Sequence, residues 1–205
     1  LRTGRYYDLA PTPQDAVSEE LLSLYEADYP WDHKAPRWKA AQVLKLLRQT
    51  GAGSPAGRPG GPRSWPCVLE AGCGTGEVLR LVGNGLGARR LWLIGVDWAH
   101  AALRQAAEPA QWPGDVVLLR GDVQRLPVAE GAVHLLLAID LLEHLPDPSE
   151  FLHEARRVAN EIIIKVPISE SPDQYTKPTG HMQFLRADDY RRMLHDTDWQ
   201  VVGER

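Results

Sequence analysis

The chain has 205 residues, which is the usual size of a single domain. Apolar residues make up 43% of it and charged residues 24%, as in an ordinary globular protein. The net charge of −4 gives no basic excess of the kind that neutralises phosphates, so the composition does not favour nucleic acid as a partner. No apolar run reaches the ~18 residues needed to cross a membrane, and we expect no membrane partner and no signal peptide.

The chain begins with a segment, residues 1–50, that we predict to be helical and to cap the substrate site. Apolar residues recur there at helical spacing at Ala40, Val43, Leu44 and Leu47. Residues 51–66 follow with five glycines and four prolines, a composition that indicates a loop. A third segment, residues 67–205, is predicted to form the main domain.

Short apolar runs alternate with helix-length segments from residue 67 onward. The runs are nearly unbroken, which is typical of strands that are buried on both faces of a parallel sheet. They cover residues 67–71, 91–96, 116–119, 133–139 and 162–166, and the helices between them are predicted at 75–84, 99–107 and 148–159. This alternation predicts an α/β fold with a doubly wound, mostly parallel sheet and helices on both faces. A loop at 167–184, a helix at 187–195 and a short strand at 199–202 are expected to follow.

A glycine-rich turn links the first of these strands to its helix. Gly72, Gly74 and Gly76 allow a tight turn and the close approach of a ligand. Asp97 ends the next strand, roughly 20 residues later, where an acid accepts hydrogen bonds from ribose hydroxyls. Trp98 follows it and would stack on a purine or pack as a core aromatic. These features indicate a nucleotide-like cofactor at the carboxyl ends of the strands.

The third and fourth of these strands also end in acidic residues. Asp122 would suit a donor such as an adenine amine, and its alternative role is to cap a short helix at 123–126. Asp140 ends the fourth strand, and carboxylates converging there would suit a cationic ligand. Asp147 and Pro148 are a favourable helix start, with a capping side chain followed by proline.

Four strings in this order resemble the motifs of class I S-adenosylmethionine-dependent methyltransferases. They are VLEAGCGTGEVL (68–79), IGVDWA (94–99), LLRGDVQRLP (118–127) and AIDLLEHLPDP (138–148). The last string, together with GHMQFL at 180–185, resembles the branch that acts mostly on small molecules. The resemblance implies a Rossmann-like methyltransferase fold with S-adenosyl-L-methionine as cofactor. Its sheet normally ends in a hairpin of two strands. We expect only the first of these, at 199–202, with the final edge strand missing or replaced by a second subunit in a homodimer.

The resemblance also implies which residues bind the cofactor. Asp97 would hold the ribose, Trp98 would face the adenine, Asp122 would accept from the adenine amine, and the Val123 amide would lie beside it. The methionine part would be surrounded by Glu70, Gly72, Cys73 and Gly74, with Ile139 or Asp140 near its amino group. Glu70 stands where aspartate is commoner in the family.

A positive side chain before the first motif often holds the carboxylate of the cofactor in this family. We assign this role first to Arg37 and second to Lys34, by position alone, and simple exposure is the alternative.

Two histidines, His144 and His181, are candidate bases for a hydroxyl acceptor because histidine titrates near neutral pH. Their alternative roles are to fix the turn before Pro146 and to pack at the entry to the last helix. No metal site is predicted. Cys67 and Cys73, six residues apart beside a glycine turn, do not indicate a disulfide, and a reducing cytoplasm is the simplest compartment.

The leading hypothesis is an enzyme that moves a methyl group to an O, N or C atom of a small-molecule acceptor. Methylation of RNA or protein is a second hypothesis. The chain has Ile139–Leu142 in place of an Asn-Pro-Pro-Tyr string, which argues only against the enzymes that methylate adenine or glutamine amides. A non-catalytic, cofactor-binding or partner-stabilising subunit with a methyltransferase fold is a third. The GxGxG spacing and Asp122 argue against a fourth, an NAD-dependent oxidoreductase.

Overall fold

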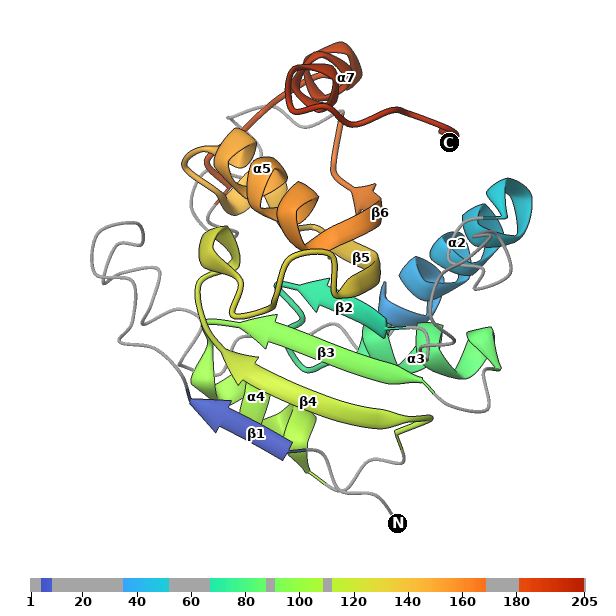
Figure 1. Cartoon of the computed structure of the whole chain (residues 1–205), viewed down its shortest axis with the longest axis vertical. Coiled ribbons are helices and arrows are strands. Elements are labelled where there is room, and N and C mark those ends of the chain that lie inside the picture. The colour runs from blue at the N-terminus through green and yellow to red at the C-terminus, as the bar shows by residue number, and fades with distance from the viewer. Residues whose placement is uncertain are drawn as a thin grey trace.

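The computed structural model describes residues 5–8, 35–51, 67–87, 91–108, 112–168 and 181–204. Its centre is a six-stranded sheet in the order β1-β4-β3-β2-β5-β6, in which all paired strands are parallel (Figure 1). The strands are β1 (Arg5–Asp8), β2 (Cys67–Ala71), β3 (Trp92–Asp97), β4 (Asp115–Arg120), β5 (Val133–Ile139) and β6 (Ala159–Lys165). Parallel pairing places the carboxyl ends of all six strands at one edge of the sheet, where ligands bind in open α/β sheets.

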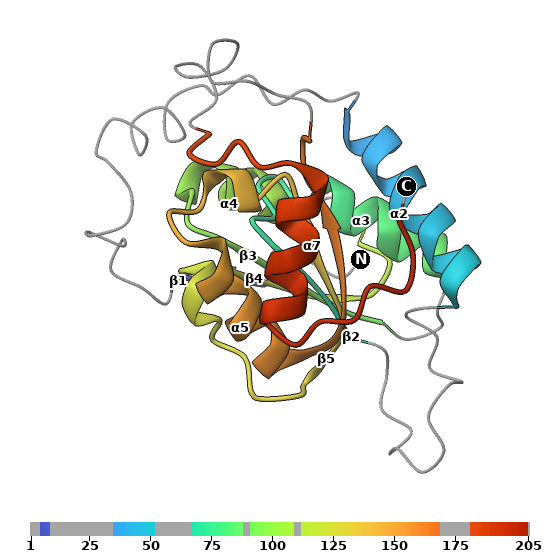
Figure 2. The same cartoon turned by 90° about the horizontal axis from the view of Figure 1, so that it is seen from above.

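Helices connect these strands and cover both faces of the sheet. The α-helices are α2 (Ala35–Thr50), α3 (Glu77–Leu86), α4 (His100–Ala107), α5 (Pro148–Val158) and α7 (Ala187–Asp196). Two single turns of 3₁₀ helix, η2 (Val123–Arg125) and η3 (Leu142–His144), follow β4 and β5. Figure 2 shows α5 and α7 on one side of the sheet and α2 and α3 on the other. No helix among the described residues is long and apolar enough to cross a membrane.

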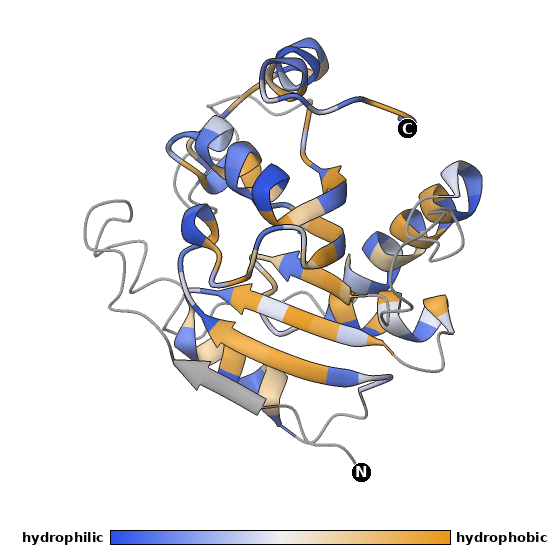
Figure 3. Ribbon diagram, viewed as in Figure 1, coloured by the Kyte–Doolittle hydropathy of each residue, from blue (hydrophilic) through white to orange (hydrophobic). Residues whose placement is uncertain are grey.

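The central strands are apolar on both faces because each face packs against helices (Figure 3). Val68 of β2 enters the core that contains α2, α3 and α4, whereas its neighbour Leu69 enters the core that contains α5 and α7. Both side chains are buried, as is all of β2. The predicted doubly wound parallel sheet is therefore confirmed, and α5 begins as predicted, with Asp147 capping the Ser149 amide and Pro148 in the first turn.

Both edges of the sheet differ from what the sequence predicts. Sequence reasoning did not predict β1, which pairs with β4 at one edge. The strand predicted at 199–202 is wrong, because these residues form no strand. The Trp199 indole donates to the Leu152 carbonyl at 3.1 Å and stacks under Arg156, which holds the segment on α5 rather than in a ladder. Among the described residues β6 is thus the other edge, and the homodimer that would cover it stays a prediction.

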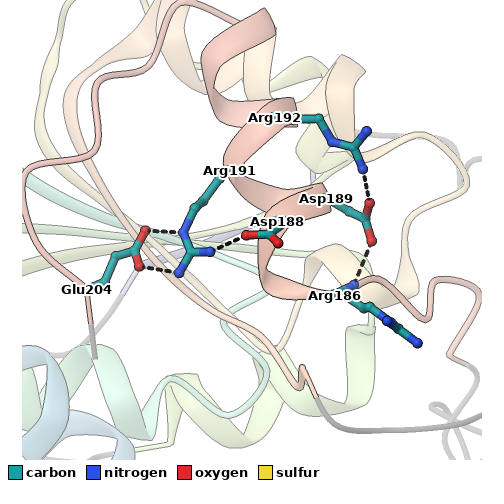
Figure 4. Close-up of polar contacts among 6 residues, drawn as sticks. All are labelled: Arg186, Asp188, Asp189, Arg191, Arg192 and Glu204. Carbon is teal, nitrogen blue, oxygen red and sulfur yellow. Dashed lines mark hydrogen bonds and ion pairs between the residues drawn. The ribbon is translucent and has the colours of Figure 1, made fainter.

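The segment after α7 is also tied back to that helix by charged side chains. Arg191 donates to both carboxylate oxygens of Glu204 and to Asp188, while Arg192 pairs with Asp189 (Figure 4). Asp189 also accepts from the Arg186 amide at the start of the helix. These contacts are exposed, so each stabilises the fold little, and they mainly direct the chain end across the helix.

Both ends of α3 are formed by glycines in the left-handed region, and they offer a test of the packing around the glycine turn. Gly76 has φ 69°, and a Cβ there would lie 2.8 Å from the Trp112 ring, whereas Gly87 has φ 60° with open space around it. We expect Gly76→Ala to lower the free energy of unfolding by about 2–4 kcal/mol and Gly87→Ala by only about 1–2 kcal/mol. Urea unfolding of the two variants measures both, and equal losses would contradict the close contact with Trp112.

Candidate functional site

The glycine turn after β2 is fastened to the carboxyl end of β3. The amides of Gly72 and Cys73 both donate to the Val96 carbonyl, at 2.8 and 3.1 Å. Gly72 has φ 69° and Gly74 has φ 51°, conformations that favour glycine. The turn therefore lies at the carboxyl edge of the sheet between β2 and β3, as the sequence predicted.

Asp97 ends β3 with its carboxylate turned toward this turn. Its Oδ2 accepts from the Gly74 amide at 2.7 Å and its Oδ1 from the Ala99 amide at 2.8 Å, and the side chain is buried. Two amide donors fix the carboxylate in one orientation. A buried carboxylate held in this way at the carboxyl end of a strand suits a ligand that presents two adjacent hydroxyls.

Glu70 is buried beneath the turn, where its Oε2 accepts from the Leu79 amide at 2.9 Å. The pKa of the Glu70 carboxyl is raised to about 8, chiefly by burial and to a smaller extent by neighbouring Asp97 and Asp140, against the opposing effects of the Leu79 hydrogen bond and Lys39. At neutral pH the carboxyl is therefore mostly uncharged. Cys73 is also buried, and burial raises the pKa of its thiol, so this residue contributes packing and backbone groups.

The purine side of the predicted site is built from β3 and β4. Asp122 caps η2 through its Oδ1, which accepts from the Gln124 amide at 2.8 Å, so its capping role is present. Val123 is buried, and the half-buried Trp98 follows Asp97 directly. The structure thus brings Asp97, Trp98, Asp122 and Val123 to the ends of adjacent strands.

Asp140, just after β5, is held between two lysines. It has φ 53°, which is uncommon for a residue other than glycine. Its Oδ2 pairs with Lys39 Nζ at 2.7 Å, and its Oδ1 pairs with Lys165 at the end of β6. The preceding residue, Ile139, is buried at the end of β5. This charged cluster faces the glycine turn from the opposite side of β2, where the strand order reverses.

Lys39 is a site residue that sequence reasoning missed. The predicted Arg37 is exposed on α2, and Lys34 lies outside the described residues. A signal was available, because Lys39 precedes the buried Val43 by one helical turn and so shares its face of the helix. Arg37 instead shares a face with the exposed Ala41.

His144 and His181 lie together at the end of η3, with ring centroids 4.8 Å apart and rings nearly perpendicular. The buried carboxylate of Glu143 lies with them, and the ligand atoms of the three side chains are all within 4.8 Å of one another. Sequence reasoning picked the two histidines but not their proximity or Glu143. The sequence separation between residues 144 and 181 gives no signal of this contact.

The domain and its fold have known counterparts. A methyltransferase domain family matches residues 69–161. Over 140 residues the chain is 29% identical to a probable S-adenosylmethionine-dependent methyltransferase of Mycolicibacterium smegmatis, covering 65% of this chain and 52% of that protein. In its matched part the chain is similar to class I S-adenosylmethionine-dependent methyltransferases. It spans about half the length of the curated relatives it matches, 52% in this case.

Solved structures share the fold of this methyltransferase domain. A chain from the complex of the Haloferax volcanii Trm112 methyltransferase activator with a methyltransferase superposes with a TM-score of 0.64 at 17% identity, covering 88% of this chain and 76% of that one. Magnesium protoporphyrin IX methyltransferase from Synechocystis, solved with bound cofactor, superposes with a TM-score of 0.58 at 16% identity, covering 82% and 70%. The family uses S-adenosylmethionine as its methyl donor.

The residues of the domain fit this cofactor chemically. Asp97 and Asp122 place carboxylates, which accept hydrogen bonds, at the ends of neighbouring strands, where ribose hydroxyls and an adenine amine would donate to them. Across β2, Lys39 and Asp140 supply the opposite charges that a zwitterionic amino acid requires. The uncharged Glu70 carboxyl adds no anion to this end of the site near pH 7.

Proposed function

We propose that the domain transfers a methyl group from S-adenosylmethionine to a small-molecule acceptor. The observation that carries this proposal is the orientation of Asp97, whose carboxylate is fixed on the glycine turn by the Gly74 amide at 2.7 Å. This orientation supports binding of an adenosyl ribose at the turn. The alternative, a non-catalytic subunit that binds the cofactor or stabilises a partner, requires the same cofactor site without transfer.

In this proposal each side of the site binds one part of the cofactor. Asp97 holds the ribose, and Trp98, Asp122 and Val123 contact the adenine. Lys39, rather than Arg37, holds the methionine carboxylate. The rest of the methionine part contacts Glu70, Gly72, Cys73, Gly74, Ile139 and Asp140.

The acceptor is proposed to bind beside η3. When bound, S-adenosylmethionine supplies a methyl group on a positively charged sulfur, which becomes neutral on transfer. Fixed anions near that sulfur would oppose the loss of charge, and the uncharged Glu70 carboxyl avoids this. His144 or His181 would accept the proton of a hydroxyl acceptor.

A small-molecule acceptor is favoured by the two motifs that resemble the small-molecule branch. The described parts of these motifs pack on each other, since the amides of Met182 and Gln183 both donate to the Glu143 carbonyl, at 2.7 and 3.0 Å. The net charge of −4 also disfavours a nucleic acid acceptor. The cytoplasm stays part of the proposal, because Cys67 and Cys73 are free thiols.

Labelled transfer tests the proposed activity. The purified chain is incubated with methyl-labelled S-adenosylmethionine and fractionated cell extract, with Asp97→Asn as the inactive control. We expect label in the low-mass fraction with the wild-type chain only. Label in protein or RNA would contradict the small-molecule acceptor, and cofactor binding without transfer to any fraction would support the non-catalytic alternative.

The role of Lys39 is tested by two alanine variants on the same helix. We expect Lys39→Ala to weaken binding of S-adenosylhomocysteine about 10-fold, because an ion pair with the methionine carboxylate is lost. Arg37→Ala, which removes an exposed side chain, should leave the affinity unchanged. Isothermal titration measures both, and the reverse ranking would assign the role to Arg37.

A further inference from the structure

Glu143, His144 and His181 form a set of side chains that the cofactor site does not use. All three offer a ligand atom within 4.8 Å of the others. Glu143 is 1% exposed, whereas both histidines are half-buried, so the cluster has one ligand in the interior and an accessible side. Two imidazoles and one carboxylate are a common ligand set for a catalytic metal ion.

The backbone holds these three residues in place. The Glu143 carbonyl accepts from the Met182 and Gln183 amides, and the Gln183 side chain donates to the carbonyls of Leu145 and Pro146, at 3.1 and 3.0 Å. Four hydrogen bonds thus fasten the segment after His181 to the η3 turn. A site whose ligands are fixed before the ion arrives loses less entropy on binding.

We propose that Glu143, His144 and His181 bind one divalent first-row transition metal ion, with Zn²⁺ as the reference probe. Imidazole nitrogens favour ions such as Zn²⁺ over Mg²⁺ and Ca²⁺, which prefer oxygen ligands. In a tetrahedral site with bonds of about 2.0–2.1 Å the ligand atoms lie about 3.4 Å apart. The present spacing, within 4.8 Å, therefore requires only side-chain rotation to close around an ion.

The position of this cluster relates it to the methyl acceptor, and this step rests on the proposed function. Leu141 lies between η3 and the glycine turn of the cofactor site. A Cβ on Gly72 would lie 2.9 Å from the Leu141 Cδ1, and the Leu141 carbonyl accepts from the His144 amide of η3 at 2.9 Å. Three protein ligands leave at least one coordination position open, which suits an acceptor hydroxyl, because a metal ion lowers the pKa of such a group. With both histidines bound to the ion, the ion would replace them in promoting loss of the acceptor proton. The acceptor oxygen would lose its proton to solvent and form the C–O bond while the C–S bond breaks with its electron pair left on sulfur.

Metal titration tests the site without any assay of activity. The full chain is freed of metal with a chelator and titrated with Zn²⁺, Mn²⁺ and Mg²⁺ in competition with a chromogenic indicator. We expect one Zn²⁺ per chain and far weaker binding of Mg²⁺. His144→Gln, His181→Gln and Glu143→Gln should each weaken Zn²⁺ binding by at least about 10–100-fold, the cost that loss of even an outer-shell partner typically carries. They should also change the absorption bands of the Co²⁺-substituted protein.

The matched control is His195→Gln, which removes a histidine that is 89% exposed on α7. It should bind Zn²⁺ like the wild type, and thermal unfolding of the metal-free variants shows that each is folded. Zn²⁺ binding that is absent, or that is weakened equally by His195→Gln, would overturn the site. Titration with S-adenosylhomocysteine separates the two proposals, because a wild-type chain that binds this ligand but no Zn²⁺ refutes only the metal site.

Discussion

Asp97→Asn is expected to weaken binding of S-adenosylhomocysteine by about 100-fold or more. Two ribose hydroxyls would no longer donate to a charged acceptor, and each such hydrogen bond contributes about 1.5–3 kcal/mol. The amide also places an N–H group where the carboxylate now accepts from Gly74 at 2.7 Å or from Ala99 at 2.8 Å. Isothermal titration measures the affinity, and circular dichroism shows that the variant is folded.

The control for this prediction is Asp115→Asn. Asp115 begins β4 at the amino-terminal edge of the sheet, at the opposite end of the strand from the cofactor site. This variant should bind S-adenosylhomocysteine like the wild type. A folded Asp97→Asn variant with wild-type affinity would show that the ribose does not bind at Asp97.

Glu70→Gln is expected to stabilise the chain at alkaline pH. The pKa of Glu70 is about 8 in the folded protein, above its ordinary value of about 4.5 in an unfolded chain, because burial disfavours the charged form. The stability that the protonated carboxyl contributes is complete below about pH 4.5 and is lost as the pH rises to about 8. Glutamine mimics the protonated form at every pH.

The free energy of unfolding of Glu70→Gln should therefore match that of the wild type near pH 5 and exceed it by about 3–5 kcal/mol at pH 9. Denaturant unfolding at both pH values measures this difference. Glu130→Gln, which changes an exposed glutamate, should show no such pH-dependent gain. A Glu70→Gln variant that is equally destabilised at pH 5 and pH 9 would refute the raised pKa.

The sequence predicted the interior of the fold well because burial leaves a direct mark on it. A strand that is buried on both faces must consist almost entirely of apolar residues. Strand β5, with the sequence VHLLLAI, is an example. The glycine turn and Asp97 were predicted for a similar reason. Glycine is favoured where the backbone has a positive φ, and a carboxylate is favoured where two hydroxyl donors are to be accepted.

The edges and long-range contacts were less predictable. Strand β1 has only four residues, Arg5–Asp8, which is too short a run to be predicted. The sequence of residues 199–202 resembles that of a strand, but the Trp199 indole donates to the Leu152 carbonyl and packs against Arg156. Lys39 and Asp140 are brought together by the packing of α2 beside the sheet, and His144 and His181 by the return of a distant segment. Neither pair follows from local periodicity.

The central claim is that the carboxyl edge of the sheet binds S-adenosylmethionine between Asp97 and the Lys39–Asp140 pair. Isothermal titration of the purified wild-type chain with S-adenosylhomocysteine tests it most directly. We predict one binding site per chain, with an affinity that falls in Asp97→Asn and Lys39→Ala. No detectable binding by the folded chain at millimolar ligand would contradict the assignment of this site.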